Sequence, residues 1–149
     1  LLMKRLLRFL LQPYPTKKLL LQSLSLMFLI RISLWIIPFG WLRWCLARLE
    51  SSRVDHKEAD WQVINEVIRA IRTSSRLVPR ATCLTQALAT RTLLRLSAQD
   101  SQLRIGVVKD AEDLLTAHAW VEIDGRIIVG KVPRQERYTV MKQSSATGI

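Results

Sequence analysis

A cysteine and a histidine in this sequence have the spacing and surroundings that nucleophilic chemistry needs. Cys83 follows Thr82 at the start of a helical pattern, and His118 lies further on in a strand-like segment. Thr82 can cap the helix, and the amides and dipole of a helix N-terminus favour a thiolate at Cys83. A thiolate nucleophile also needs a base or an imidazolium nearby. The pair therefore predicts acyl transfer at Cys83 with His118 as the base; the alternative is a small buried thiol and a structural imidazole.

One helix and three strands are expected to position this pair. An apolar helical pattern runs over residues 84–96 and is expected to end at residues 97–100. Residues 103–108 and 117–123 are predicted strands. The Asp124-Gly125 dipeptide predicts a two-residue hairpin turn, with residues 126–129 as the returning strand.

The motifs around Cys83 and His118 resemble the leader peptidases of lasso-peptide biosynthesis. The helical motif is Cys83-Leu84-x-x-Ala87-Leu88-Ala89, followed by Leu93-Leu94 and Ile105-Gly106-Val107. The strand motif is Ala117-His118-Ala119-Trp120-Val121-Glu122-x-Asp124-Gly125. The likeness is to the split B protein, a transglutaminase-like and papain-like cysteine peptidase, and it covers roughly the C-terminal half of the chain. The two motifs are specific in combination and weak apart.

The resemblance implies an α+β fold, in which a catalytic helix packs on a small antiparallel sheet behind an apolar helical N-terminal region. It implies a hydrolase that removes the leader from a ribosomally made precursor peptide (a RiPP). A separate small recognition protein would deliver the leader, and a separate macrolactam cyclase would close the ring. No cofactor is expected. The expected location is the cytoplasm, and the inner face of the membrane is the alternative within it.

The third catalytic residue departs from the family's pattern. Alignment on His118 puts the family's aspartate at or near Gly130, where this chain has no carboxylate. Asp124, Glu122 or a backbone carbonyl could orient the ring instead. Glu122 and Asp124 share strand parity with His118, although the Asp-Gly signature assigns Asp124 to the hairpin turn. Asp124 is therefore kept as an uncertain third member of the site.

Further groups near the pair are candidates for contact with the substrate. Trp120 and Glu122 share the strand face of His118 and are the predicted substrate-binding residues, with core packing as the alternative for Trp120. Amides at the start of the Cys83 helix could stabilise an oxyanion. The sequence leaves open whether water or an amine accepts the acyl group.

Length, charge and cysteine content narrow the function classes. The 149-residue chain is one domain with an appendage, and its formal net charge of +11 favours acidic partners. Its cations are scattered rather than gathered with aromatic residues, so no nucleic-acid surface is expected. The two cysteines, Cys45 and Cys83, predict neither a disulfide framework nor a metal site. Cys45 is interpreted as a buried, unreactive thiol.

The N-terminal region is apolar, most of all over residues 19–37. That segment approaches bilayer-spanning length, but Arg31 within it would cost about 3 kcal/mol in a membrane, and no signal-peptide cleavage site follows it. Docking on the domain or a partner, and membrane association, both stay open. Trp41 and Trp44 can share a helix face and are the candidate partner-docking residues, with core packing as the alternative.

The expected organisation of the chain follows from these segments. Residues 1–50 form the apolar docking or membrane-associated region, residues 51–59 a linker, residues 60–142 the peptidase core, and residues 143–149 a flexible tail. The core is expected to begin with an amphipathic helix capped by Asp60. A second function fits the same features, namely a non-catalytic, membrane-associated helical adaptor with a transglutaminase-like core.

Overall fold

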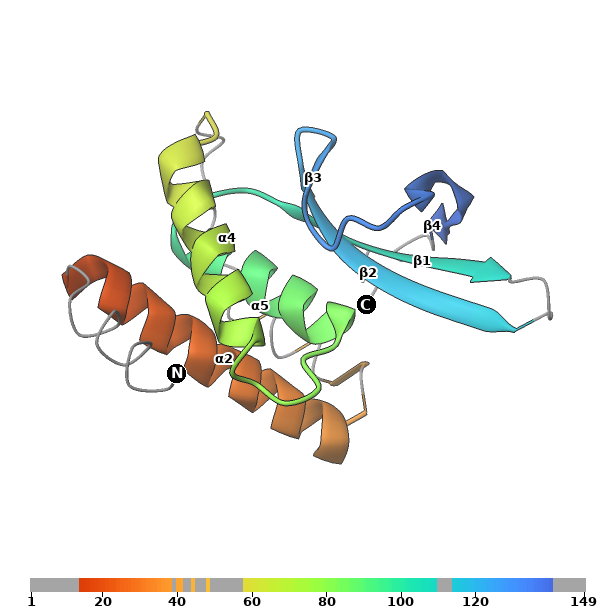
Figure 1. The fold of residues 1–149 in the computed structure, drawn as a ribbon, viewed down its shortest axis with the longest axis horizontal. Coiled ribbons are helices and arrows are strands. Elements are labelled where there is room, and N and C mark those ends of the chain that lie inside the picture. The colour runs from red at the N-terminus through yellow and green to blue at the C-terminus, as the bar shows by residue number, and fades with distance from the viewer. Residues whose placement is uncertain are drawn as a thin grey trace.

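A four-stranded antiparallel sheet with helices stacked on one side forms the fold (Figure 1). The computed structural model describes residues 14–38, 40, 41, 44, 48, 58–109 and 114–140. The elements in chain order are α2 (Tyr14–Ile36), α4 (Trp61–Ser75), α5 (Cys83–Leu96), β1 (Gln102–Lys109), β2 (Leu115–Ile123), β3 (Arg126–Val129), the 3-10 turn η1 (Gln135–Arg137) and β4 (Thr139–Val140). Helix α5 contacts the sheet, and α2 and α4 pack against α5 and each other. The expected α+β fold is confirmed.

The sheet has the strand order β3-β2-β1-β4. Strands β1 and β2 pair antiparallel along their whole length, with Gly106 opposite His118. Asp124 and Gly125 join β2 to β3 with φ values of 48° and 74°, and positive φ at both central residues is what a tight hairpin turn requires. The predicted hairpin is therefore confirmed. Because β3 and β4 lie at opposite edges, residues 130–138 cross from one edge of the sheet to the other.

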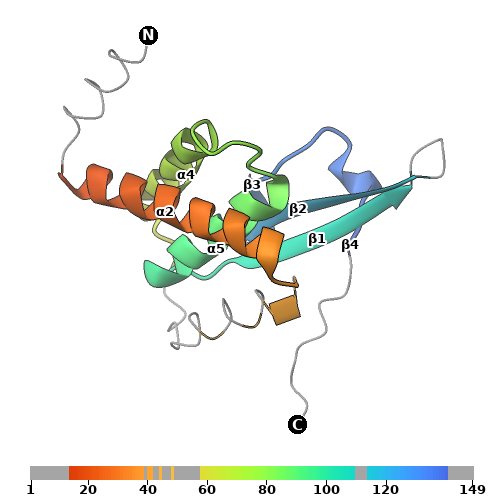
Figure 2. The ribbon, with the colours of Figure 1, turned by 90° about the horizontal axis from the view of Figure 1, so that it is seen from below.

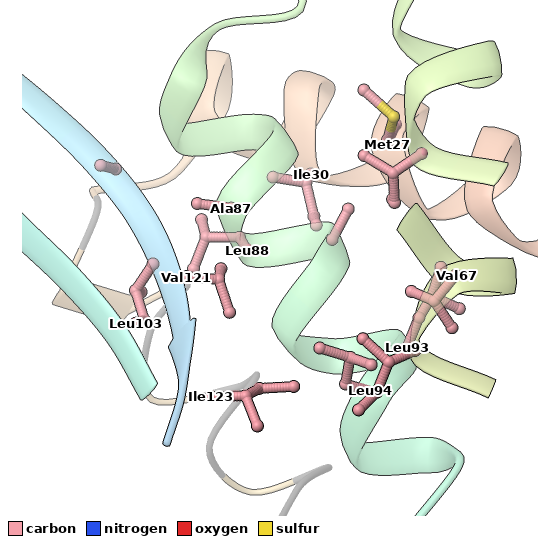
Figure 3. Close-up of a cluster of buried hydrophobic side chains, with 14 of the residues drawn as sticks. Met27, Ile30, Val67, Ala87, Leu88, Leu93, Leu94, Leu103, Val121 and Ile123 are labelled. Carbon is pink, nitrogen blue, oxygen red and sulfur yellow. The ribbon is translucent and has the colours of Figure 1, made fainter. Parts of the chain in front are cut away.

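One hydrophobic cluster joins the sheet to helices α2, α4 and α5. Leu103 and Val121 point from the sheet toward Leu88 of α5, and Met27 and Ile30 enter the same cluster from α2 (Figure 3). Side chains alternate between the two faces of a strand. The apolar residues of β2 at every second position, beginning with Ala119, therefore face the helices, and the residues between them face the other way.

Helix α4 forms as its sequence pattern predicts. Its N-cap is Asp60, whose carboxylate accepts hydrogen bonds from the backbone amides of Gln62 and Val63. The apolar stripe contributes three fully buried side chains, those of Ile64, Val67 and Ile71. The cap satisfies amides of the first turn. A helix of this length is marginal by itself, so its stability comes mainly from packing its apolar face on the core.

Helix α2 is docked on the rest of the domain along one face (Figure 2). The hydroxyl oxygens of Ser23 and Ser74 lie 2.6 Å apart in a buried hydrogen bond between α2 and α4. Residues 16–36 are also long and apolar enough to cross a bilayer by length and composition. Most of the predicted linker, the predicted tail and Cys45 lie outside the described residues.

Candidate active site

Cys83 is the first residue of α5, as the sequence predicts. The Thr82 hydroxyl accepts a hydrogen bond from the backbone amide of Thr85 at 3.3 Å, so the predicted N-cap is confirmed. The side-chain amide of Gln86 donates to the Ala81 carbonyl at 3.1 Å and ties the first turn to the preceding chain. The Cys83 thiol is free and half-buried against the core. A cysteine so placed lies where helix amides and the helix dipole favour negative charge.

The His118 ring is held by a backbone carbonyl. Its Nε2 lies 2.5 Å from the carbonyl oxygen of Gly130. A carbonyl oxygen can only accept, so Nε2 carries the hydrogen of this bond and donates it. In the neutral ring the lone pair is then on Nδ1. Of the three orienting groups that the sequence leaves open, the structure selects the backbone carbonyl.

Gly130 has a backbone that leaves no room for the family's aspartate. Its φ is +85°, and a Cβ atom there would lie 2.7 Å from the Ala119 carbonyl oxygen and 3.0 Å from Trp120. Any L-residue at this position would be both strained and in steric conflict. The carbonyl that binds His118 therefore comes from a residue that has to lack a side chain.

Aromatic side chains surround the His118 ring on the sheet face away from α5. The Trp120 ring stacks beside it with centroids 6.1 Å apart, and the Tyr138 ring lies at 5.6 Å. A Cβ on Gly106 would come within 2.9 Å of both the Trp120 ring and Tyr138. The close packing around the histidine thus depends on a glycine in β1 and on a tyrosine from the segment that crosses the sheet.

Trp120 and Glu122 are joined by a hydrogen bond, and Glu122 also pairs with Arg104. Glu122 Oε1 accepts a hydrogen bond from the Trp120 indole at 2.7 Å, and Glu122 Oε2 accepts one from Arg104 Nε at 3.3 Å. Trp120 is only 3% exposed. The Glu122 side chain is 20% exposed, and substrate contact by these two residues stays a prediction. Their role in this geometry is to fix the aromatic face beside His118.

Asp124 lies away from the His118 ring. It occupies the exposed hairpin turn at the end of β2, and a strand rise of roughly 3.3 Å per residue puts it about 20 Å from His118 along the strand. The ring is already bound by Gly130. The structure thus has Asp124 in the turn that its Asp-Gly signature predicts, and a catalytic part for Asp124 stays a prediction.

Cys83 belongs to the helix that packs on one face of β2, and the His118 side chain lies on the opposite face of that strand. The apolar face of β2 packs on α5, and His118 alternates with it onto the opposite face. Among the residues that the structure describes, no hydrogen bond joins the Cys83 thiol to the His118 ring. A direct contact between sulfur and imidazole therefore belongs to the proposal below and not to the described geometry.

The sequence indicates some of the surrounding residues and not others. Gly106 interrupts an otherwise apolar strand, and a glycine in a strand interior often marks a close approach of another group. No local signal identifies Tyr138 or Arg104, because the crossover segment and the register of β1 bring them to the site. Within the described ranges, no cluster of His, Cys, Asp and Glu could hold a metal ion.

Trp41 and Trp44 share a face, as their spacing predicts. Their ring centroids are 6.0 Å apart, and both rings are more than half exposed. The Arg48 guanidinium lies 5.1 Å from the Trp44 ring centroid, within cation–π range. This exposure rules out core packing for the pair in the described structure and leaves it accessible to a partner.

Comparison with protein families identifies the class. The family model described as the Transglutaminase-like superfamily matches residues 26–143, which include the cysteine helix, the sheet and the C-terminal part of α2. The chain therefore belongs to the transglutaminase-like superfamily. Searches of curated proteins and of solved structures give no match.

Proposed function

We propose that this protein is a cysteine peptidase that removes the leader from a lasso-peptide precursor. Membership of a superfamily that includes cysteine peptidases supports the class of reaction. The observation that carries the proposal is the His118 ring, whose Nε2 is bound to the Gly130 carbonyl. This bond orients the ring and leaves Nδ1 for a thiol. The lasso-peptide substrate rests on the motifs around Cys83 and His118.

The reaction would proceed by acyl transfer through Cys83. The thiolate attacks the scissile carbonyl carbon, and a thioester forms as the C–N bond breaks. His118 gives its Nδ1 proton to the leaving amine. Water then attacks the thioester and loses its proton to Nδ1, which releases the acid and restores the thiolate and imidazolium. Amides in the first turn of α5 would stabilise the oxyanion of each tetrahedral intermediate.

Contact between the two side chains gives the most direct structural test. 1,3-Dibromoacetone carries two alkylating carbons on one carbonyl and can join a thiol to an imidazole only when both lie within its short reach. We expect mass spectrometry to detect a cross-linked Cys83–His118 peptide pair. Modification at Cys83 alone, with no cross-link at any reagent concentration, would argue against the catalytic pair.

Activity is tested by leader release from the precursor with the recognition protein present. Cys83→Ala and His118→Ala should each lower the rate at least about 10³-fold, because nucleophile and base act as a unit. Cys45→Ala serves as the matched cysteine control and should keep wild-type turnover. Wild-type turnover in either site variant would reject the assignment.

The proposed partners are the precursor, a leader-recognition protein and the cyclase. The Trp41–Trp44 pair is the proposed contact for the recognition protein, since two exposed aromatic rings beside an arginine are typical anchors of an interface. The recognition protein should co-purify with wild type and be lost when Trp41 and Trp44 are both replaced by glutamate. Undiminished binding to that variant would reject this surface.

A non-catalytic adaptor is the competing function. It is favoured by the glycine in place of the acid and by the absence, among the described residues, of a hydrogen bond between Cys83 and His118. A thiol-reactive probe separates the two functions. A peptidase should label at Cys83 faster than free cysteine does, and more slowly in His118→Ala. An adaptor should show neither effect.

A further inference from the structure

Helix α2 has an exposed outer face that is mainly apolar, with the polar Ser25 among its side chains. Its most exposed apolar side chains are Leu29 at 62%, Trp35 at 87% and Ile36 at 73%. Leu21, Phe28 and Ile32 complete this outer face, each about half exposed. Helical periodicity puts these residues on the side opposite Met27 and Ile30.

The inner face of the same helix is committed to the protein core. Met27 and Ile30 are buried in the cluster shared with α4 and α5. Ser23 is fully buried and bonded to Ser74. Moving α2 into a bilayer as a separate span would expose this cluster and leave the Ser74 hydroxyl without its bond, which carries a large free-energy cost. Only the outer face of α2 is therefore available to contact a membrane or another molecule.

In the sequence, the charge of α2 and of the residues on either side of it has one sign, and the acidic residue that the structure brings next to α2 at Lys18 is Glu66 of α4. The residues that precede the first acidic residue, Glu50, include the cations Lys4, Arg5, Arg8, Lys17, Lys18, Arg31, Arg43 and Arg48. A second copy of the chain would bring a segment with the same excess of positive charge toward this one, which is unfavourable. An anionic surface with an apolar layer beneath complements both the charge and the exposed side chains.

We propose that the outer face of α2 lies in the plane of an anionic lipid bilayer while its inner face stays in the protein core. Apolar side chains of an interfacial helix enter the boundary between headgroups and acyl chains, and nearby cations bind anionic headgroups. Trp35 lies near the C-terminal end of α2, and tryptophan is enriched at this depth of a membrane. In this proposal the protein is bound peripherally, with α2 lying along the bilayer surface and not across the bilayer.

Flotation of the purified full-length chain with vesicles tests the proposal. Vesicles of phosphatidylcholine with phosphatidylglycerol should carry wild type upward, and vesicles of phosphatidylcholine alone should carry at least about tenfold less. Salt at about 1 M, where the Debye length is about 3 Å, should weaken the binding. Alkaline carbonate should release the bound protein, because no segment spans the bilayer.

Substitutions on the outer face identify the contact. The double variant Leu29→Glu with Ile32→Glu should lower vesicle binding at least about tenfold, since each adds a charge to the buried surface. Leu115→Glu is the control, because Leu115 is 71% exposed and is the first residue of β2, a strand on the other side of α5 from α2 (Figure 1). Both variants should unfold at the wild-type urea concentration.

Each other outcome would overturn the proposal. Resistance to carbonate would mean that α2 spans the bilayer. Equal flotation of wild type and the double variant would mean that another surface binds lipid. Failure of wild type to bind the anionic vesicles would reject a lipid contact. A dimer seen by light scattering and dissociated by the same double variant would then assign the face to a second copy. None of these results depends on peptidase activity.

Discussion

At the scale of single residues, a backbone carbonyl stands where the resembled family has a carboxylate. Gly130 binds His118 Nε2 through its carbonyl oxygen, and its positive φ and the nearby Ala119 carbonyl exclude a side chain. The absence of a carboxylate at this position therefore does not leave the imidazole without an orienting group. A neutral acceptor would stabilise an imidazolium less than a carboxylate does, because charge-assisted hydrogen bonds are the stronger ones.

Two glycine substitutions test this description of Gly130. Gly125→Ala should lower the free energy of unfolding by about 1 kcal/mol, because φ is positive there but nothing lies within 4 Å of the new Cβ. Gly130→Ala should cost about 1–3 kcal/mol more, because its Cβ would overlap the Ala119 carbonyl. Urea denaturation measures both values. Equal losses would mean that the close packing at Gly130 is absent.

At the scale of elements, α5 and β2 each position one member of the proposed pair. The helix is fixed by its N-cap and by the core beneath it, and the strand by its full pairing with β1. The alternation of β2 divides its side chains between the helix-facing core and the aromatic cluster of His118, Trp120 and Tyr138. The proposed reaction therefore depends on the position of the first turn of α5, which carries Cys83, relative to β2, which carries His118.

The cap of α5 gives a prediction at this scale. Thr82→Ala removes the acceptor for the Thr85 amide and should lower stability by about 1 kcal/mol. Thr82→Ser keeps a hydroxyl at the same place and should stay within about 0.5 kcal/mol of wild type. Urea midpoints distinguish the two variants. A loss of the same size in the serine variant would show that the Thr82 methyl group, and not its hydroxyl, matters.

At the scale of the whole molecule, α2 belongs to the same folded unit as the sheet. The family match begins within this helix, and the hydrophobic cluster runs from α2 through α5 to β1 and β2 (Figure 3). The predicted division into residues 1–50 and residues 60–142 stays a prediction. In the described structure, one face of α2 is part of the core and the other is exposed. The inner face of α2 therefore belongs to the core, and its outer face is the one available to another surface.

A pair of isoleucines tests this integration. Ile30→Ala should lower the free energy of unfolding by about 2–5 kcal/mol, because Ile30 is 2% exposed within the shared cluster. Ile32→Ala, at 51% exposure on the other face, should cost about 0.5 kcal/mol or less. A single cooperative transition by circular dichroism and by tryptophan fluorescence is expected for both. Similar costs for the two variants would show that α2 does not form part of the core.

Local chemistry in the sequence determined the elements and the places of Cys83 and His118 on them. The Thr82 and Asp60 caps, the apolar stripe of α4 and the Asp-Gly turn each depend on residues close together in the chain, so their effects are visible in the sequence. The same locality explains why Asp124 is a turn residue.

Only the tertiary structure decided which group orients His118 and what surrounds it. The Gly130 carbonyl carries no side-chain signal, and Tyr138 reaches the ring through a segment that crosses the sheet. Trp120 and Glu122 were visible as a same-face pair, but their bonds to each other and to Arg104 depend on the register of β1 against β2. The sequence pattern likewise did not show which face of α2 is buried, because this helix has apolar residues on all sides. Packing assigns one face to the core because only there do α4 and α5 supply apolar partners.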